Sequence, residues 1–116
     1  MVRFKDEREA RVMKEMRGGK GEVALCSILN GEEEMTGKGR LFSAITIEPG
    51  NSIGMHPHEG ESETFYVVSG CGLYNDNGKE VPFGEGDVLH CAPGESHSIE
   101  NTGKEPLCFV ALILYA

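Results

Sequence analysis

The sequence lacks tryptophan, has only 5 prolines, and has 11 lysines and arginines against 19 aspartates and glutamates. The formal net charge of −8 argues against non-specific binding to nucleic acid or anionic membrane, because phosphate surfaces repel an acidic protein. No apolar run approaches the roughly 20 residues that cross a bilayer, and the first residues lack the apolar core of a secretory signal. We therefore expect neither nucleic acid nor membrane among the partners.

The four cysteines show no paired spacing. Cys26, Cys71, Cys91 and Cys108 lie far apart, and no two of them form a CxxC motif. Isolated thiols of this kind are typical of small buried apolar side chains. We expect reduced cysteines and a cytoplasmic protein.

Glycine is abundant, at 16 of 116 residues, and this favours many tight turns. The length predicts one domain. From Glu22 onward, about eight or nine short apolar or alternating segments are separated by turn signals, among them Pro49-Gly50 and Asn77-Gly78. This series predicts an all-β fold, a single small antiparallel β-barrel or jelly roll. Four aromatic residues are expected in its core, although one or two of them could line the cavity: Phe65, Tyr66, Tyr74 and Phe83.

The N-terminal segment has a different character. Residues 6–17, "DEREARVMKEMR", combine helix-forming residues with acid–base pairs four apart, and Gly18 and Gly19 would end a helix. The apolar stripe is narrow, so both a short helix and an extended arm are compatible with it. We expect residues 1–21 to form this arm or helix and residues 22–116 to form the β-barrel domain.

The stretch "GMHPHEGESE", residues 54–63, carries two histidines one residue apart. On a strand, His56 and His58 would face the same side, and two buried imidazoles need polar partners. A turn at Glu59-Gly60 could bring Glu63 to the same point, and "APGESHSIEN" offers His97. Three imidazoles and one carboxylate predict one divalent transition metal per chain, with Mn, Fe, Ni, Co, Cu and Zn all compatible.

Other residues near this stretch have open alternatives. Glu59 or Glu61 would take the place of Glu63 at the metal if the strand register puts a different acid there. His90, in the segment "DVLHCAPG", could face the cavity as a catalytic proton-transfer or substrate-orienting group, or could be a partly buried histidine bonded to a carbonyl. Arg40 could meet an acidic ligand or lie on the surface.

The glycine spacing around the histidines follows a pattern. His56, His58 and Glu63 lie between Gly50 and Gly70, and a second segment runs from Gly86 through Gly94 and His97 to Asn101. Together these segments resemble the two motifs of the cupin family over about residues 40 to 115. The resemblance implies a jelly roll with metal ligands at the positions of His56, His58, Glu63 and His97. Ala92 departs from the family's usual proline, but Pro93 follows and can fix the turn.

The resemblance implies three functional hypotheses. The first is a mononuclear metalloenzyme, a dioxygenase, decarboxylase or isomerase, that acts on a small carboxylate, sugar or related metabolite. The second is a non-catalytic sensor or storage protein for such a ligand, and the third is a purely structural metal. Oxalate decarboxylases place an arginine just before the first ligand histidine, whereas this chain has Ile53, Gly54 and Met55 there. That argues against oxalate decarboxylation unless Arg40 or another arginine folds over the site.

Assembly can also be predicted. A barrel of this length leaves sheet faces and edges to cover, and residues 1–30 could pack across a neighbouring subunit. Small cupins are commonly dimers, so the resemblance implies a homodimer.

Overall fold

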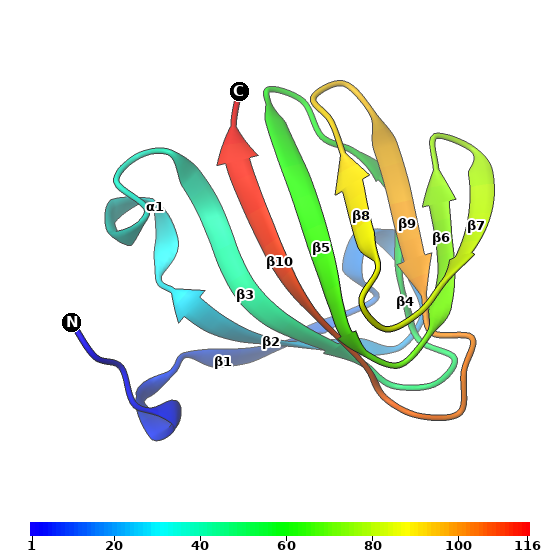
Figure 1. The fold of residues 1–116 in the computed structure, drawn as a ribbon, viewed down its shortest axis with the longest axis horizontal. Coiled ribbons are helices and arrows are strands. Elements are labelled where there is room, and N and C mark those ends of the chain that lie inside the picture. Colours follow the sequence, from blue (N-terminus) through cyan, green and yellow to red (C-terminus); the bar gives the residue numbers. More distant parts are fainter.

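Two antiparallel β-sheets face each other in the computed structural model, which describes all of residues 1–116 (Figure 1). The larger sheet has the order β1-β2-β3-β10-β5-β8 and comprises β1 (Ala10–Lys14), β2 (Glu22–Leu29), β3 (Gly39–Ile47), β10 (Leu107–Tyr115), β5 (Glu61–Ser69) and β8 (Val88–Cys91). The smaller has the order β4-β9-β6-β7 and comprises β4 (Ser52–Pro57), β9 (Ser96–Glu100), β6 (Gly72–Asp76) and β7 (Lys79–Phe83). The helical elements are the 3-10 turns η1 (Lys5–Glu7) and η2 (Met16–Gly18) and the helix α1 (Gly31–Glu34). None of these helices could span a membrane.

The predicted all-β jelly roll is confirmed, although the sheets form an open sandwich and not a closed barrel. Asn77-Gly78 joins β6 to β7, with φ angles of 53° and 98° that a two-residue hairpin turn of type I′ requires. β2 begins at Glu22, where the series of short segments was expected to start. Turn chemistry and alternation therefore specify most of these strands.

The core lies between the sheets and follows the two-residue period of the strands. In β10, Leu107, Phe109, Ala111 and Ile113 are buried, whereas the residues between them are half-buried. Phe65, Tyr74 and Phe83 belong to this core, as predicted. Tyr66 does not, because it neighbours Phe65 on β5 and faces outward.

All four cysteines are free, but only Cys91 is buried. The expectation of burial is wrong for Cys71, which is exposed in the connection between β5 and β6.

The N-terminal segment does not form the helix that residues 6–17 allowed. Ala10–Lys14 instead form β1, which pairs with β2 along its whole length. The reason is physical: the edge of β2 offers backbone partners to every second residue, whereas the narrow apolar stripe gave a helix little surface to bury. After β1 the chain turns through η2 and is joined to β4, where the Ser52 N–H donates to the Lys20 carbonyl at 3.0 Å and the Lys20 N–H donates to Ser52 Oγ at 2.9 Å.

Candidate metal centre

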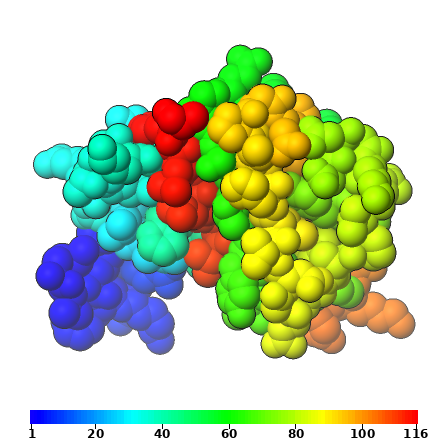
Figure 2. Space-filling view, turned by 45° about the horizontal axis from the view of Figure 1, so that its top comes forward, coloured from blue at the N-terminus to red at the C-terminus, as the bar shows by residue number.

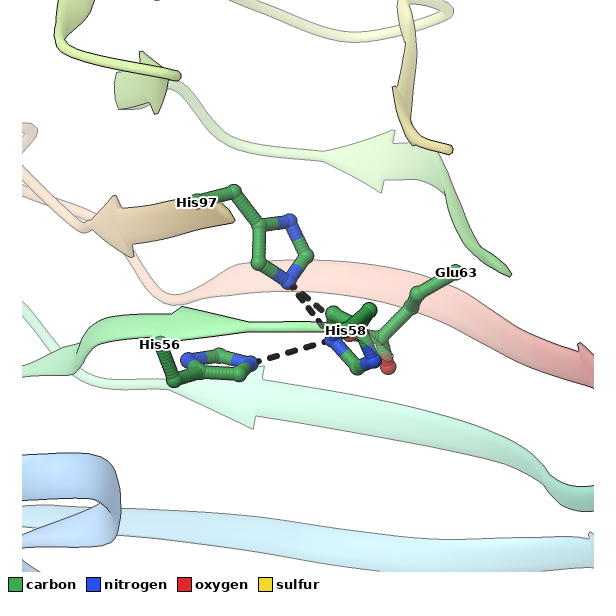
Figure 3. Close-up of side chains that lie close together, drawn as sticks. All are labelled: His56, His58, Glu63 and His97. Carbon is green, nitrogen blue, oxygen red and sulfur yellow. Dashed lines mark hydrogen bonds and ion pairs between the residues drawn. The ribbon is translucent and has the colours of Figure 1, made fainter. Parts of the chain in front are cut away.

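Three imidazoles and one carboxylate converge at one end of the core (Figure 3). The side chains of His56, His58, Glu63 and His97 are all buried, and one potential ligand atom from each lies within 4.8 Å of the others. The Nε2 atom of His58 is 3.1 Å from that of His56 and 3.0 Å from that of His97. Glu63 Oε1 lies 3.0 Å from His58 Nε2 and 3.1 Å from His97 Nε2.

Strand pairing and one turn bring these residues together. His56 on β4 lies directly opposite His97 on β9, within the smaller sheet. His58 follows the end of β4 and is tethered to the neighbouring loop, since its N–H donates to the Glu95 carbonyl at 3.0 Å and its carbonyl accepts from the Gly94 N–H at 2.7 Å. Gly60, with φ of 71°, then reverses the chain into β5, which carries Glu63 in the larger sheet. The cluster therefore joins the two sheets.

Each imidazole has an outer partner on its Nδ1 atom. His56 Nδ1 lies 2.7 Å from the Gly54 carbonyl, and His58 Nδ1 lies 2.9 Å from Glu61 Oε1. His97 Nδ1 lies 2.8 Å from the hydroxyl of Tyr74. A carbonyl and a carboxylate accept only, so Nδ1 of His56 and of His58 carries a proton. The Nε2 atom of neutral His56 therefore faces the centre with its lone pair, and Nε2 of His58 does so once it gives up the proton that it donates to Glu63. Partners of this kind fix the orientation of histidines that bind metals.

The charges within the cluster follow from burial and contact. Burial lowers the pKa of His56, and the hydrogen bond with Glu63 raises the pKa of His58. Burial alone would raise the pKa of Glu63, but hydrogen bonds from His58 and His97 bring it below its ordinary value. Glu63 is therefore an anion at neutral pH, beside a neutral His56.

The donor set fits a divalent transition metal. Imidazole nitrogen and carboxylate oxygen are ligands that Mn, Fe, Co, Ni, Cu and Zn all accept. Two atoms each about 2.1 Å from one ion and at a right angle to each other are about 3.0 Å apart, which is close to the separations of 3.0 and 3.1 Å in the cluster. A cation at this point would also satisfy lone pairs that otherwise face one another.

The other predicted residues lie outside the cluster. Glu59 is exposed, and Glu61 supports His58 from behind while it also accepts two hydrogen bonds from Arg40, at 2.7 and 2.6 Å. These contacts, the one with Arg40 first, lower the pKa of Glu61 to about 2. His90 is exposed on β8, its Nδ1 atom lies 2.8 Å from Thr64 Oγ1, and it does not line the cavity described next. The supporting role of Tyr74 was not predicted, because an aromatic residue in a strand is indistinguishable from core in the sequence.

A cavity of about 60 Å³ adjoins the cluster. His56, His58 and Glu63 line it together with aliphatic side chains and three arginines, Arg11, Arg17 and Arg40. The sequence had offered no arginine directly before His56, but the fold supplies three from other places. Two of them come from the N-terminal segment, whose position relative to the histidines no local sequence pattern predicts.

Known proteins resemble this chain over most of its length. The family model described as Cupin domain matches residues 43–113. The oxalate-binding protein of Thermotoga maritima is 52% identical over 99 residues, which cover 85% of this chain and 81% of that protein. The crystal structure of a predicted oxalate decarboxylase from Thermotoga maritima superposes with a TM-score of 0.94 and 46% identity, over 100% of both chains.

More distant matches share only part of a protein or only the fold. Mannose-1-phosphate guanylyltransferase ManC of Salmonella typhimurium is 33% identical over 63 residues, which make up 54% of this chain but only 13% of that protein. A sugar phosphate isomerase of the cupin superfamily from Silicibacter pomeroyi superposes with a TM-score of 0.73 over 96% of this chain and 73% of its own, at 19% identity. With the fold, the histidine and glutamate cluster and these similarities in agreement, the predicted resemblance is confirmed, and the chain belongs to the cupin family.

Proposed function

We propose that this cupin holds one divalent transition-metal ion through His56, His58, Glu63 and His97 and binds a small dicarboxylate beside it, with oxalate as the reference ligand. One observation carries the proposal: the buried cluster opens on a cavity of about 60 Å³ that three arginines line. Pockets for drug-sized ligands measure roughly 300–1,000 Å³, so the volume favours a very small ligand. The similarity to an oxalate-binding protein supports the same ligand class.

The residues have distinct parts in this function. The bound ion supplies an electrophilic centre for a carboxylate oxygen. Glu63 offsets part of the charge of the ion, and the Nδ1 partners hold the imidazoles in place. Aliphatic side chains such as Ile45 and Ile53 line the same cavity and limit the access of water, which strengthens the attraction between the ligand and the cationic groups.

Binding without turnover is favoured over a decarboxylase or isomerase. Outside the cluster, the only ionisable side chains that line the cavity are arginines, which do not exchange protons near neutral pH. A decarboxylase or isomerase needs a group that transfers a proton beside the ligand, and His90 is not placed for it. An open cavity beside the cluster also argues against a purely structural metal, because structural sites are closed by protein ligands.

The test is a two-step titration of untagged protein. Metal-free protein is incubated with manganese, iron, nickel or zinc, and elemental analysis measures how much metal it has bound. Calorimetry then measures oxalate binding to the metal-loaded and metal-free forms. We expect about one ion per chain and oxalate binding only to the loaded form. If the protein binds none of these metals, the proposed metal site is wrong. If the metal-loaded protein does not bind oxalate, the proposed ligand is wrong. Consumption of oxalate by the loaded protein would restore the enzyme hypothesis.

We also propose that the protein forms a homodimer through the outer face of the larger sheet. Tyr66 and Val88 are paired neighbours on β5 and β8 and are 52% and 62% exposed, and Val68 is exposed beside them. Figure 2 displays the surface of β10 in red, β5 in green and β8 in yellow, side by side. A sheet that is apolar on both faces is more stable when both faces are buried. A second copy of the chain, related by a twofold axis, would bury the outer face.

A further inference from the structure

We infer that Arg11 and Arg17, both from the N-terminal segment, are the residues that recognise the ligand's carboxylate group, while Arg40 is not. The inference rests on the proposed function and assigns its specificity to residues outside the barrel motifs. It follows from the positions of the two side chains and from their lack of other partners.

Arg11 is exposed on the edge strand β1, and its register places it on the side of the sheet that carries the cavity. It lies opposite Leu25 of β2, and Leu25 is buried and lines the same cavity. The next residue, Val12, lies opposite Ala24 and faces the other side of the sheet. Strand alternation therefore directs Arg11, but not Val12 or Lys14, toward the cluster.

Arg17 is held against β4 by a close contact between backbones. A Cβ atom at Gly54 would lie 2.1 Å from the Arg17 carbonyl oxygen, and one at Gly19 would lie 2.2 Å from the Ser52 carbonyl oxygen. Both positions are glycine, so η2 approaches β4 more closely than side chains would allow. In Figure 3 the blue ribbon of the N-terminal segment lies on the His56 side of the cluster. Gly54 also provides the carbonyl that holds His56, so the same residue positions Arg17 and a proposed metal ligand.

The guanidinium groups of Arg11 and Arg17 have no partner within the chain, in contrast to the other three arginines. Arg3 pairs with Glu34, Arg8 donates to the carbonyls of Cys26 and Ser27, and Arg40 pairs with Glu61. The two arginines without a hydrogen bond or ion pair both line the cavity beside the cluster. A guanidinium presents parallel donors that match a carboxylate, and both residues are exposed to a ligand that arrives from solvent. Arg40 is already paired with Glu61, to which its Nε and one Nη atom donate, so its charge is offset within the chain.

The experiment replaces each arginine by glutamine and measures oxalate affinity of manganese-loaded protein by calorimetry. Arg11→Gln and Arg17→Gln should each weaken oxalate binding about 10- to 100-fold and leave manganese affinity unchanged. Arg17→Lys should reduce oxalate affinity less than Arg17→Gln, because lysine keeps the positive charge although it lacks the parallel donors. Lys14→Gln removes the same charge from the outward side of β1 and is the matched control.

The outcomes separate this inference from the proposed function. Wild-type protein that binds oxalate while both glutamine variants bind it equally well overturns the role of the arginines alone. If Lys14→Gln weakens oxalate binding as much as Arg11→Gln does, the role of the arginines is also overturned, because the loss of any positive charge in this segment would then explain the effect. Wild-type loaded protein that does not bind oxalate overturns the proposed function, and the inference with it. Unchanged manganese affinity and melting temperature in the variants verify that they fold.

Discussion

Each histidine of the cluster is oriented by an outer partner within the chain. The Gly54 carbonyl, Glu61 and Tyr74 hold the three Nδ1 atoms, and the three Nε2 atoms consequently meet in one place. Preorganised ligands lose little conformational entropy on binding, which favours high affinity.

His58→Ala should abolish most metal binding, because His58 Nε2 lies in the middle of the cluster, next to His56, Glu63 and His97. We expect a fall in manganese or zinc affinity of more than about 100-fold, measured by competition with a chelating dye. His90→Ala is the control, and it should keep the wild-type value because His90 contacts Thr64 on the outer face. Equal loss in both variants would refute the assignment.

Glu61 is a positioning residue whose effect should be separable from that of a ligand. Glu61→Gln removes the carboxylate that holds His58 Nδ1 and should weaken metal binding about 10- to 100-fold without abolishing it. Glu59→Gln, an exposed neighbour, should change nothing. Retention of full affinity in Glu61→Gln would mean that Gly60 and the backbone of His58 alone orient the ring.

Metal affinity should fall as the pH is lowered. The hydrogen bond with Glu63 raises the pKa of His58, so protons compete with the ion for this imidazole at a higher pH than for an ordinary histidine, near 6.5. In metal-free protein the same contact stabilises the fold below that pH and is lost as the pH rises through the raised pKa. Manganese titrations at about pH 8 and about pH 5.5 should give the tighter binding at the higher pH, and constant affinity would contradict this.

At the scale of elements, the junction between η2 and β4 determines where the N-terminal segment lies. Gly54→Ala would place a methyl group against the Arg17 carbonyl and displace η2. We expect a loss of about 1–3 kcal/mol of unfolding free energy, as for overpacked sites, together with weaker oxalate binding. Denaturant unfolding measures the first, and Gly84→Ala is the control because nothing lies within 4 Å of its Cβ position. A neutral Gly54→Ala would indicate that η2 moves freely.

The elements also show which parts of the fold are predictable from the sequence. The turns at Glu59-Gly60 and Asn77-Gly78 lie where the sequence predicts them. Residue type alone did not separate Phe65, which is buried, from its neighbour Tyr66, which is exposed. His58 was assigned to a strand but lies just past β4, held by backbone contacts with Gly94 and Glu95 that no local pattern encodes.

The N-terminal segment was the least predictable part of the chain. Local propensity allowed a helix over residues 6–17, whereas the unpaired edge of β2 favoured a strand. The positions of Arg11 and Arg17 beside the cluster depend on that pairing and on contacts across more than thirty residues of sequence, such as Arg17 with Gly54. Motif spacing could find the four proposed metal ligands, but not the arginines.

At the scale of the whole molecule, the apolar outer face of the larger sheet should decide the state of assembly. We expect a dimer at micromolar concentration in sedimentation or size-exclusion experiments. Val88→Glu would put a charge on this exposed position and should shift the protein to monomer with an unchanged melting temperature of the subunit. The control Lys79→Glu, on the exposed hairpin of β7, should stay dimeric. A wild-type monomer would contradict the proposed interface.

The place of β10 constrains how the molecule can be assembled during synthesis. This strand follows all the others in sequence but lies between β3 and β5 in the larger sheet. Until Leu107–Tyr115 has left the ribosome, β3 and β5 each present an unpaired edge, and Glu63 on β5 lacks the neighbour that ties it to the rest of the sheet. A chain that stops before Leu107 would therefore carry all four proposed metal ligands without the strand that joins β5 to β3, and we expect it to bind no metal.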